Sequence, residues 1–186
     1  MRISEKQLAA VTVGELRPLN KPIALQPYNP DWPVFYGKLE RQVHAALGSK
    51  ALLIAHVGST SVPGLSAKPV IDMVLAVANS ADEDAYIPPL EGARYTLRIR
   101  EPEWFQHRML KTPVIDGNLH VFSQGCEEIG RMLALRNWLR TNENDRSLYE
   151  RTKRELAARS WRYTQNYADA KSDVVREILG RALNDA

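Results

Sequence analysis

Residues 56–72, HVGSTSVPGLSAKPVID, constrain the fold more than any other part of this sequence, because they form a loop of small residues between two apolar segments. The flanking residues 51–57 and 70–77 are short and apolar, and are therefore predicted to be strands. Asp72 interrupts the second strand. An ionised carboxylate inside an apolar strand is costly unless it is paired, hydrogen-bonded or bound to a cation. Asp72 therefore indicates a functional site.

The loop has the composition of an anion-binding turn. Gly58 permits close backbone approach to a ligand, and Ser59 and Thr60 supply hydroxyl groups. Successive N–H groups that leave a strand can form a nest for phosphate. Lys68 adds a positive charge nearby. The sequence thus predicts a phosphate-binding loop with the carboxylate of Asp72 facing it.

Strand periodicity separates Asp72 from the residues that would fill the core. Side chains alternate along a strand, so Asp72 and Val74 are predicted to share one face, opposite Ile71 and Met73. A purely structural alternative is that the carboxylate accepts hydrogen bonds from residues 58–60 and only locks the turn. We favour the functional interpretation because the loop is also built to approach a ligand.

Composition indicates one compact, cytoplasmic domain. The chain of 186 residues is long enough for a single well-formed core. The single cysteine, Cys126, excludes an intramolecular disulfide and a thiolate-rich metal site. No apolar run approaches the roughly 20 residues that a membrane span requires. A net charge of +3 favours anionic ligands but lacks the dense basic footprint of a nucleic-acid binder, so nucleic acid is not expected as a partner.

Residue patterns divide the chain into three segments. Residues 1–22 form an N-terminal arm or short helix with a linker, residues 23–126 a mixed core, and residues 127–186 a helical region. Asp116-Gly117 is a strong hairpin signal within the core. The further predicted elements are a helix over 31–47 with Asp31 as its N-cap, helices over 82–90, 148–159, 163–183 and from 127 onward, and strands over 94–100, 104–110 and 118–122. A mixed sheet followed by packed helices is typical of the α+β class.

Four sequence strings resemble those of a known family. They are GSTSVPGLSAKPVID at 58–72, YNPDWP at 28–33, LHV at 119–121 and RNWLR at 136–140. A strand, Gly-Ser and then an aspartate in a second strand resembles the polymerase-beta-like nucleotidyltransferase superfamily. The longer strings resemble the GrpB family, from about Ile23 to the C-terminus. This resemblance implies a nucleotidyltransferase-like mixed β-sheet with packed helices and a poorly defined transferase activity.

The resemblance also implies a reaction and residue roles. The expected reaction moves a nucleotidyl group from a nucleoside triphosphate to an unknown hydroxyl or amine acceptor. The implied roles are phosphate binding by Gly58, Ser59 and Thr60, Mg²⁺ binding by Asp72, general base or metal ligand for His120, and charge neutralisation by Lys68 and Lys171. The expected partner is therefore a nucleoside triphosphate or another phosphorylated small molecule.

One position departs from the superfamily pattern. Working nucleotidyltransferases commonly present two metal-binding carboxylates at i and i+2, and here the second position is Val74. Asp72 alone could hold one Mg²⁺ together with substrate phosphates, but a two-metal site would be incomplete. The candidate acids from the following strands are Glu101, Glu103 and Asp116. The alternative is a non-catalytic module that binds a nucleotide or phosphorylated metabolite. A third is a partner-regulating protein with an exposed apolar stripe on its helical end.

Several polar residues have a structural alternative. A hydrogen-bonded core histidine is as good an interpretation of His120 as a catalytic one, and His56 is expected to orient the loop. Lys153, Arg136 and Arg140 on the last helices are expected to form solvated faces or ion pairs. Lys171 is the exception, because it lies one turn after a tyrosine in a pattern that resembles the family.

Overall fold

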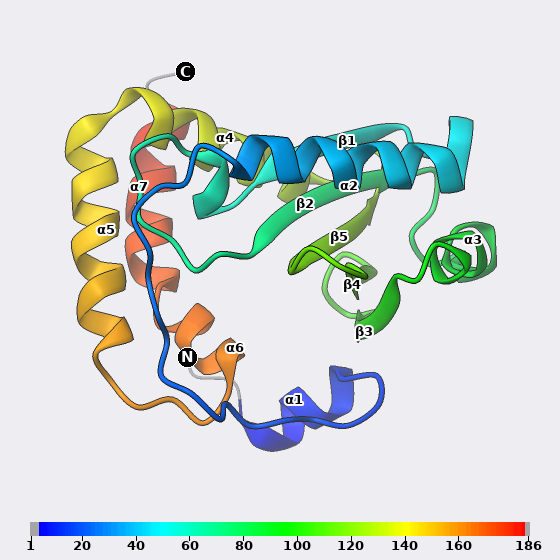
Figure 1. Cartoon of the computed structure of the whole chain (residues 1–186), viewed down its shortest axis with the longest axis horizontal. Coiled ribbons are helices and arrows are strands. Elements are labelled where there is room, and N and C mark those ends of the chain that lie inside the picture. Colours follow the sequence, from blue (N-terminus) through cyan, green and yellow to red (C-terminus); the bar gives the residue numbers. More distant parts are fainter. Residues whose placement is uncertain (1–3, 185–186) are drawn as a thin grey trace.

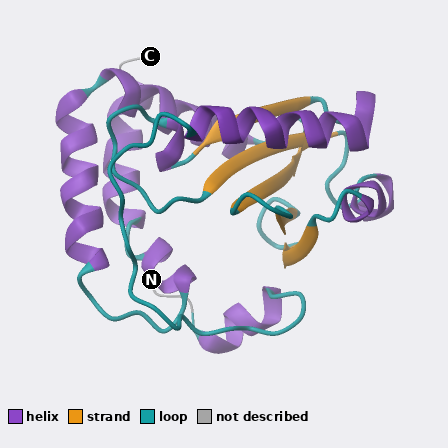
Figure 2. Ribbon diagram, in the orientation of Figure 1, coloured by secondary structure: helices purple, strands orange, loops and turns teal. Residues whose placement is uncertain are grey.

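A five-stranded mixed sheet organises the structure, a computed structural model that describes residues 4–184 (Figure 1). The strand order is β1-β2-β5-β4-β3, with β2 and β5 parallel and the other neighbours antiparallel. The strands are β1 (Leu53–Val57), β2 (Ile71–Val77), β3 (Thr96–Glu101), β4 (His107–Lys111) and β5 (Gly117–Ser123). Helices pack on both faces of the sheet (Figure 2), which confirms the predicted α+β class.

Local sequence signals explain where several helices begin. The α-helices are α1 (Glu5–Val11), α2 (Trp32–Leu47), α3 (Ile87–Gly92), α4 (Glu127–Thr141), α5 (Glu143–Ala157), α6 (Thr164–Asp169) and α7 (Ser172–Asn184), and the short 3₁₀ helices are η1 (Gly48–Lys50), η2 (Ser59–Ser61) and η3 (Glu83–Ala85). Ser4 and Gln7 form a capping box at the start of α1. Pro33 lies in the first turn of α2, where its missing N–H removes no intrahelical bond. Asp31 holds the N-cap position as predicted, but its side chain makes no capping hydrogen bond.

Strand β2 divides its side chains between the two faces of the sheet, as the sequence predicts. Met73 and Leu75 are fully buried in the main core, which α2 closes with Leu39. Asp72 and Val74 point to the opposite face. There α4 packs over Val74, and Asp72 lies beyond the covered area.

The loop between β1 and β2 is anchored by apolar side chains. Val62 and Leu65 are fully buried in a second cluster. Their neighbours there are Leu139 on α4, Tyr149 on α5 and Ile178 on α7. The C-terminal helices therefore hold the loop in place from the side opposite the sheet.

The N-terminal arm packs along the edge of the sheet. An isolated bridge pairs Thr12 with Ile99 of β3, the edge strand. At the other end of α1, the Glu5 carboxylate accepts from the Tyr163 hydroxyl at 2.7 Å and pairs with Arg162 at 2.8 Å. The arm thus connects the edge of the sheet to the region of α6 (Figure 1).

The strand predicted over 104–110 begins only at His107, so its predicted start is wrong. The preceding residues form a turn in which Phe105 and Gln106 adopt positive φ values of 53° and 51°. Such a backbone conformation is incompatible with a continuing strand. Trp104 in this turn is 39% exposed and stands at the edge of the cavity described below.

Three helix predictions also differ from the structure in their boundaries. The segment predicted as one helix over 82–90 is the 3₁₀ turn η3 followed by α3, which begins only at Ile87 with prolines in its first turn. The helix predicted over 148–159 begins earlier, at Glu143, because the Asn142 side chain accepts a capping hydrogen bond from the N–H of Asp145. The helix predicted over 163–183 is interrupted between α6 and α7. Among the described helices, none combines the length and apolar character needed to cross a bilayer.

Candidate functional site

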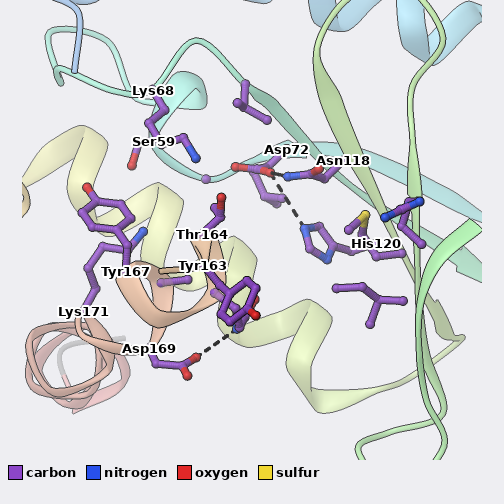
Figure 3. A pocket seen from close by; sticks show the side chains of 18 of the residues that line it. Ser59, Lys68, Asp72, Asn118, His120, Tyr163, Thr164, Tyr167, Asp169 and Lys171 are labelled. Carbon is purple, nitrogen blue, oxygen red and sulfur yellow. Dashed lines mark hydrogen bonds and ion pairs between the residues drawn. The ribbon is translucent and has the colours of Figure 1, made fainter. Parts of the chain in front are cut away.

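A cavity of about 970 Å³ lies on the face of the sheet that carries Asp72. Its wall is formed by the loop after β1, by strands β2 to β5, by the N-terminal arm and by helices α4 to α6. Figure 3 shows Asp72 between Lys68 on one side and His120 on the other. All seven predicted site residues line this cavity: Gly58, Ser59, Thr60, Lys68, Asp72, His120 and Lys171.

The loop and the carboxylate meet at Gly58. This residue has a φ of 68°, which lies in the left-handed region that favours glycine. A Cβ atom at this position would lie 2.7 Å from Asp72 Oδ2. Glycine is therefore required both by the backbone conformation and by the close approach, and the structure places Asp72 against the loop.

The charge of Asp72 is compensated by its surroundings. Asn118 Nδ2 donates a hydrogen bond of 2.7 Å to Asp72 Oδ1, and His120 Nε2 lies 3.9 Å from the same oxygen. Burial alone would raise the pKa of Asp72, but interactions with His120 and Asn118 outweigh burial and hold the pKa below its ordinary value. The carboxylate is therefore ionised at neutral pH, and 31% of the side chain remains exposed to receive a ligand.

Two histidines and a glutamate continue the polar network across strands β5, β4 and β3. His120 Nδ1 lies 3.0 Å from His107 Nε2, and His107 Nδ1 lies 2.6 Å from Glu101 Oε2. Since an ionised carboxylate only accepts hydrogen bonds, Glu101 places the proton of His107 on Nδ1. Burial lowers the pKa of His107 more than Glu101 raises it, so the ring is neutral and its Nε2 accepts from His120 Nδ1–H. A neutral His120 therefore presents an unprotonated Nε2 to the cavity.

Four lysines line the cavity: Lys68, Lys111, Lys153 and Lys171. Lys111 pairs with Asp116, and the other three lie near the loop. Lys68 and Lys171 have no carboxylate partner among residues 4–184, and Lys171 Nζ lies 4.8 Å from the centre of the Tyr167 ring. Lys153 is 2% exposed and donates a hydrogen bond to the Ser66 carbonyl, so the prediction of a solvated or ion-paired side chain is wrong. Burial, and to a smaller extent the charge of Lys171, lowers the pKa of Lys68. The same two causes lower the pKa of Lys153 to about 7. A bound anion would favour the charged form of both groups.

Tyr167 on α6 contributes an unsatisfied polar atom to the cavity wall. Its hydroxyl is buried and has no hydrogen-bond partner within the described part of the chain. Burial raises the pKa of Tyr167 to about 12, so the phenol stays protonated and can donate. A buried hydroxyl without a partner is costly, and a ligand oxygen would remove that cost.

The two loop hydroxyl groups have different surroundings. Thr60 is 1% exposed, and its Oγ1 donates to the Val70 carbonyl at 3.1 Å and lies 3.0 Å from His56 Nε2. Burial lowers the pKa of His56 to about 4, so the neutral ring donates this bond and orients the loop, as expected. Ser59 is half-buried at the cavity, and its hydroxyl makes no hydrogen bond to another described residue. Ser59 is therefore the loop hydroxyl available to a ligand, whereas Thr60 braces the turn.

Helix α4 holds the loop through two arginines. Arg136 Nη1 donates to the His56 carbonyl at 3.0 Å, and Arg140 donates two bonds of 2.9 and 2.8 Å to the Ser61 carbonyl. Arg140 remains exposed, as expected for a solvated face, but neither arginine forms an ion pair with a described residue, and both guanidinium groups bind backbone carbonyls of the loop. The turn that approaches Asp72 is thus fixed by hydrogen bonds as well as by apolar packing.

The acidic groups around Asp72 do not form a metal cluster. Within residues 4–184, no three His, Cys, Asp or Glu side chains are arranged to hold a metal ion. Val74 is fully buried under α4. Glu101 and Asp116 line the cavity but bond to other side chains, and Glu103 lies outside the cavity lining. One carboxylate with substrate phosphates can hold a single Mg²⁺, but these residues do not build a two-metal site.

A sequence signal exists for Lys153 although the prediction missed it. Lys153 follows Tyr149 by four residues and precedes Leu156 by three, and all three are buried on α5. This is the spacing of one helix face, so the pattern places the lysine among apolar residues. Only the packing of the loop against α5 explains why a cation is retained there.

The hairpin signal at Asp116-Gly117 could also have predicted that His107 lies near His120. Met109 pairs with His120 across the β4–β5 ladder, and alternation then places His107 on the same face as His120. The register depends on the length of the turn, which Asp116-Gly117 alone does not determine. Glu101 pairs with His107 across the β3–β4 ladder, and this pairing places its carboxylate beside the histidine.

The chain matches one family model and several curated proteins over most of its length. The family model described as GrpB protein matches residues 22–181. A UPF0157 protein from Halalkalibacterium halodurans is 55% identical over 179 residues, which cover 96% of this chain and 92% of that protein. Another UPF0157 protein, from Streptomyces coelicolor, is 42% identical over 160 residues, which cover 86% of this chain and 84% of that protein.

A solved structure and a longer enzyme also match. The crystal structure of conserved protein GrpB from Enterococcus faecalis has a TM-score of 0.75 at 28% identity, and covers 87% of this chain and 98% of that one. A dephospho-CoA kinase from Mycolicibacterium paratuberculosis is 26% identical over 189 residues, which cover 87% of this chain. The match covers 46% of that kinase, so the similarity concerns less than half of the enzyme.

Proposed function

This chain belongs to the GrpB family, and we propose that it transfers a nucleotidyl group from a nucleoside triphosphate to a hydroxyl or amine acceptor. The observation that carries the proposal is the position of Asp72 between two chemically different parts of one cavity (Figure 3). Lys68 and Lys171 lie to one side of Asp72, and His120 lies to the other. Transfer of a phosphoryl-type group depends on such positioning and on stabilisation of negative charge.

The phosphates would occupy the lysine side. Lys68 and Lys171 have no carboxylate partner in the described chain and can neutralise a polyphosphate. Ser59 and Tyr167 offer hydroxyl groups that lack partners there. Lys153 would gain its full charge when an anion binds beside it. Together these groups favour a highly charged phosphate ligand.

The acceptor would occupy the His120 side. As the acceptor oxygen attacks the α-phosphorus, a P–O bond forms, the bond to pyrophosphate breaks, and the acceptor proton moves to His120 Nε2. His107 and Glu101 are positioning residues, because they hold the proton of His120 on Nδ1 and leave Nε2 free. The negative charge of Glu101 also stabilises the imidazolium that forms, as the carboxylate of a catalytic triad does.

Magnesium fits this site as a single ion. Asp72 offers a carboxylate open to the cavity, and Mg²⁺ in nucleotide sites is commonly held by one or two carboxylates plus phosphates. Asp72 would hold the ion, which when bound would neutralise charge on the phosphates. Within residues 4–184, the nearby carboxylates of Glu101 and Asp116 bond to other side chains, so lysines would provide the remaining positive charge.

A non-catalytic binding module is the alternative, and the buried Val74 favours it. Such a module would keep the lysine side of the cavity and would not need His120. The similarity to part of a dephospho-CoA kinase agrees with a nucleotide-related role in either case. The third possibility, a partner-regulating protein, requires an apolar stripe on the C-terminal helices, but among the described residues of these helices Leu183 is the one large apolar side chain that is exposed.

Calorimetric titration with ATP, GTP, CTP and UTP, each with and without Mg²⁺, tests the proposal. We expect Lys68→Ala to weaken triphosphate binding about tenfold, because one phosphate-facing cation is lost. We expect Asp72→Asn to remove the dependence on Mg²⁺. The matched control is Lys38→Ala, an exposed lysine on α2 across the sheet, which should leave binding unchanged. Binding that ignores both Mg²⁺ and Asp72 would favour the binding module, and no binding would contradict both functions.

The tautomers of the histidines test the base independently of any substrate. In ¹⁵N-detected NMR at neutral pH, neutral His107 and His120 should both carry their proton on Nδ1. In His107→Phe, His120 should populate the Nε2–H form, because its partner is lost. His44, exposed on α2, serves as the internal reference. A proton on His120 Nε2 in the natural protein would contradict its role as base.

A further inference from the structure

The His120 side of the cavity has an apolar wall that the proposed function does not yet use. The apolar wall consists of Val11, Ile99, Trp104, Met109 and Met132. Met109 pairs with His120 across the β4–β5 ladder, and Ile99 pairs with Met109 across the β3–β4 ladder. Paired residues share a face, so the sheet presents two apolar side chains in a row beside the imidazole.

The other members of the apolar wall come from elements outside the sheet. The bridge between Thr12 and Ile99 brings the end of α1, with Val11, over the edge strand. The ring of Trp104 packs edge-on against His107, with 5.1 Å between ring centroids. Met132 reaches the cavity from α4. Three separate parts of the chain thus surround the His120 side with apolar groups.

The charged groups on this side already have partners. Lys111 Nζ pairs with Asp116 at 2.6 Å, and Arg98 Nη2 donates to the Glu15 carbonyl at 2.8 Å. Glu101 is bonded to the adjacent histidine. The two lysines on the opposite side have no such carboxylate partners among residues 4–184. Among residues 4–184, Asp72 is the open carboxylate beside His120, and in the proposed function it holds Mg²⁺. Arg98 has no carboxylate partner within that range, but its guanidinium is held by the N-terminal arm. With Asp72 and Arg98 engaged in this way, the described part of the site offers no further counter-charge to a charged acceptor.

The apolar wall continues to the protein surface. Trp104 and the adjacent Phe105 are 39% and 40% exposed, and their rings lie 5.6 Å apart in an edge-on contact. Phe105 and Gln106 hold left-handed backbone conformations, which are unfavourable for residues other than glycine. The surrounding structure therefore supports a strained turn that keeps the Trp104 ring in the cavity wall and the Phe105 ring against it. A ligand in the cavity could extend along them.

We propose that the acceptor is an uncharged alcohol or phenol with an apolar body. The body lies against the apolar wall, and the hydroxyl donates to His120 Nε2. The inference rests on the proposed function, in which the acceptor oxygen bonds to the α-phosphorus, pyrophosphate leaves and the proton passes to His120. It adds the chemical class of the second substrate, and it places polyols and charged metabolites outside that class.

Fluorescence titration with 2-naphthol, a phenol with an apolar body, tests the inference without nucleotide. We expect saturable binding that Met109→Lys and Ile99→Lys each weaken by about tenfold or more, because a charge is placed in the apolar wall. Met109→Leu should retain binding, and circular dichroism should show that the variants fold. The matched control is Val114→Lys, an 86% exposed position outside the cavity. Saturable binding that no wall variant changes, or no binding at all, would overturn the inference.

A transfer assay with Mg²⁺-ATP separates this inference from the proposed function. Formation of the adenylyl ester of 2-naphthol, detected by mass spectrometry and lost in Met109→Lys, would support both. Transfer to glycerol in preference to 2-naphthol would overturn the inference and retain the proposed function. Binding of 2-naphthol that depends on Met109, with no ATP binding in the calorimeter, would contradict nucleotidyl transfer while supporting an apolar ligand on this side.

Discussion

The two faces of the sheet are formed by the same strands, but one is covered by helices and the other borders a cavity. On one face, Met73 and Leu75 are fully buried under α2 and α3 in a continuous apolar core. On the other face, the neighbouring positions carry Asp72, Asn118 and His120, which line a cavity. The first face is closed by packing, whereas the second keeps polar groups accessible to a ligand.

This difference shows how one short strand can serve stability and function together. Successive side chains of β2 point to opposite faces, so the site needs no interruption of the core. Only Asp72 departs from the apolar character of the strand, and it lies where the loop closes over it. Substitutions at adjacent positions of β2 should therefore affect different properties of the protein.

The largest expected effect is a loss of stability when a side chain of the helix-covered face is shortened. Met73→Ala should lower the free energy of unfolding by about 2–5 kcal/mol, because a fully buried side chain is replaced by a cavity. Asp72→Asn should change it by less than about 1 kcal/mol, because the amide oxygen can still accept from Asn118. Urea unfolding of both variants measures the contrast. Equal destabilisation would show that the carboxylate mainly locks the turn, which is the structural alternative.

A smaller effect distinguishes the loop that approaches the open face from an ordinary turn. Gly58→Ala and Gly64→Ala both introduce a side chain at positive φ, which costs about 1–2 kcal/mol. Only at Gly58 would the new Cβ meet Asp72, while at Gly64 nothing lies within 4 Å. We therefore expect both variants to lose stability but only Gly58→Ala to lose Mg²⁺-ATP binding, measured by calorimetry. Equal loss of binding in both would contradict the importance of the contact with Asp72.

The smallest expected effect is a pH dependence of anion binding on the open face. Lys153, with a pKa lowered to about 7, faces the charges of Lys171, Glu150 and Arg154. An anion favours its charged form, so binding should take up protons near pH 7, and affinity should fall as pH rises, by at most about tenfold per unit. Calorimetry with tripolyphosphate in buffers of different ionisation enthalpy measures this uptake. In Lys153→Met the uptake should decrease, and an unchanged uptake would assign it to another group.

The local part of the site was predictable because its signals lie close together in the chain. A glycine and two hydroxyl residues followed by an aspartate in an apolar strand are read directly from residues 56–72. The prediction of which side of β2 faces the core holds for the same reason. Thr60 shows the limit of this reasoning, because its hydroxyl suits a ligand in the sequence but bonds to Val70 in the structure.

By itself, the sequence determined the secondary structure around the loop, the α+β class and the side of β2 on which Asp72 lies, because periodicity and turn residues act over a few positions. Only the tertiary structure decided what surrounds that carboxylate. Lys153 binds the Ser66 carbonyl 87 residues away, and His107 meets His120 only through the register of a hairpin. Contacts of this kind depend on how helices and strands pack, and the apolar wall beside His120 likewise exists only where the arm, the sheet and α4 come together.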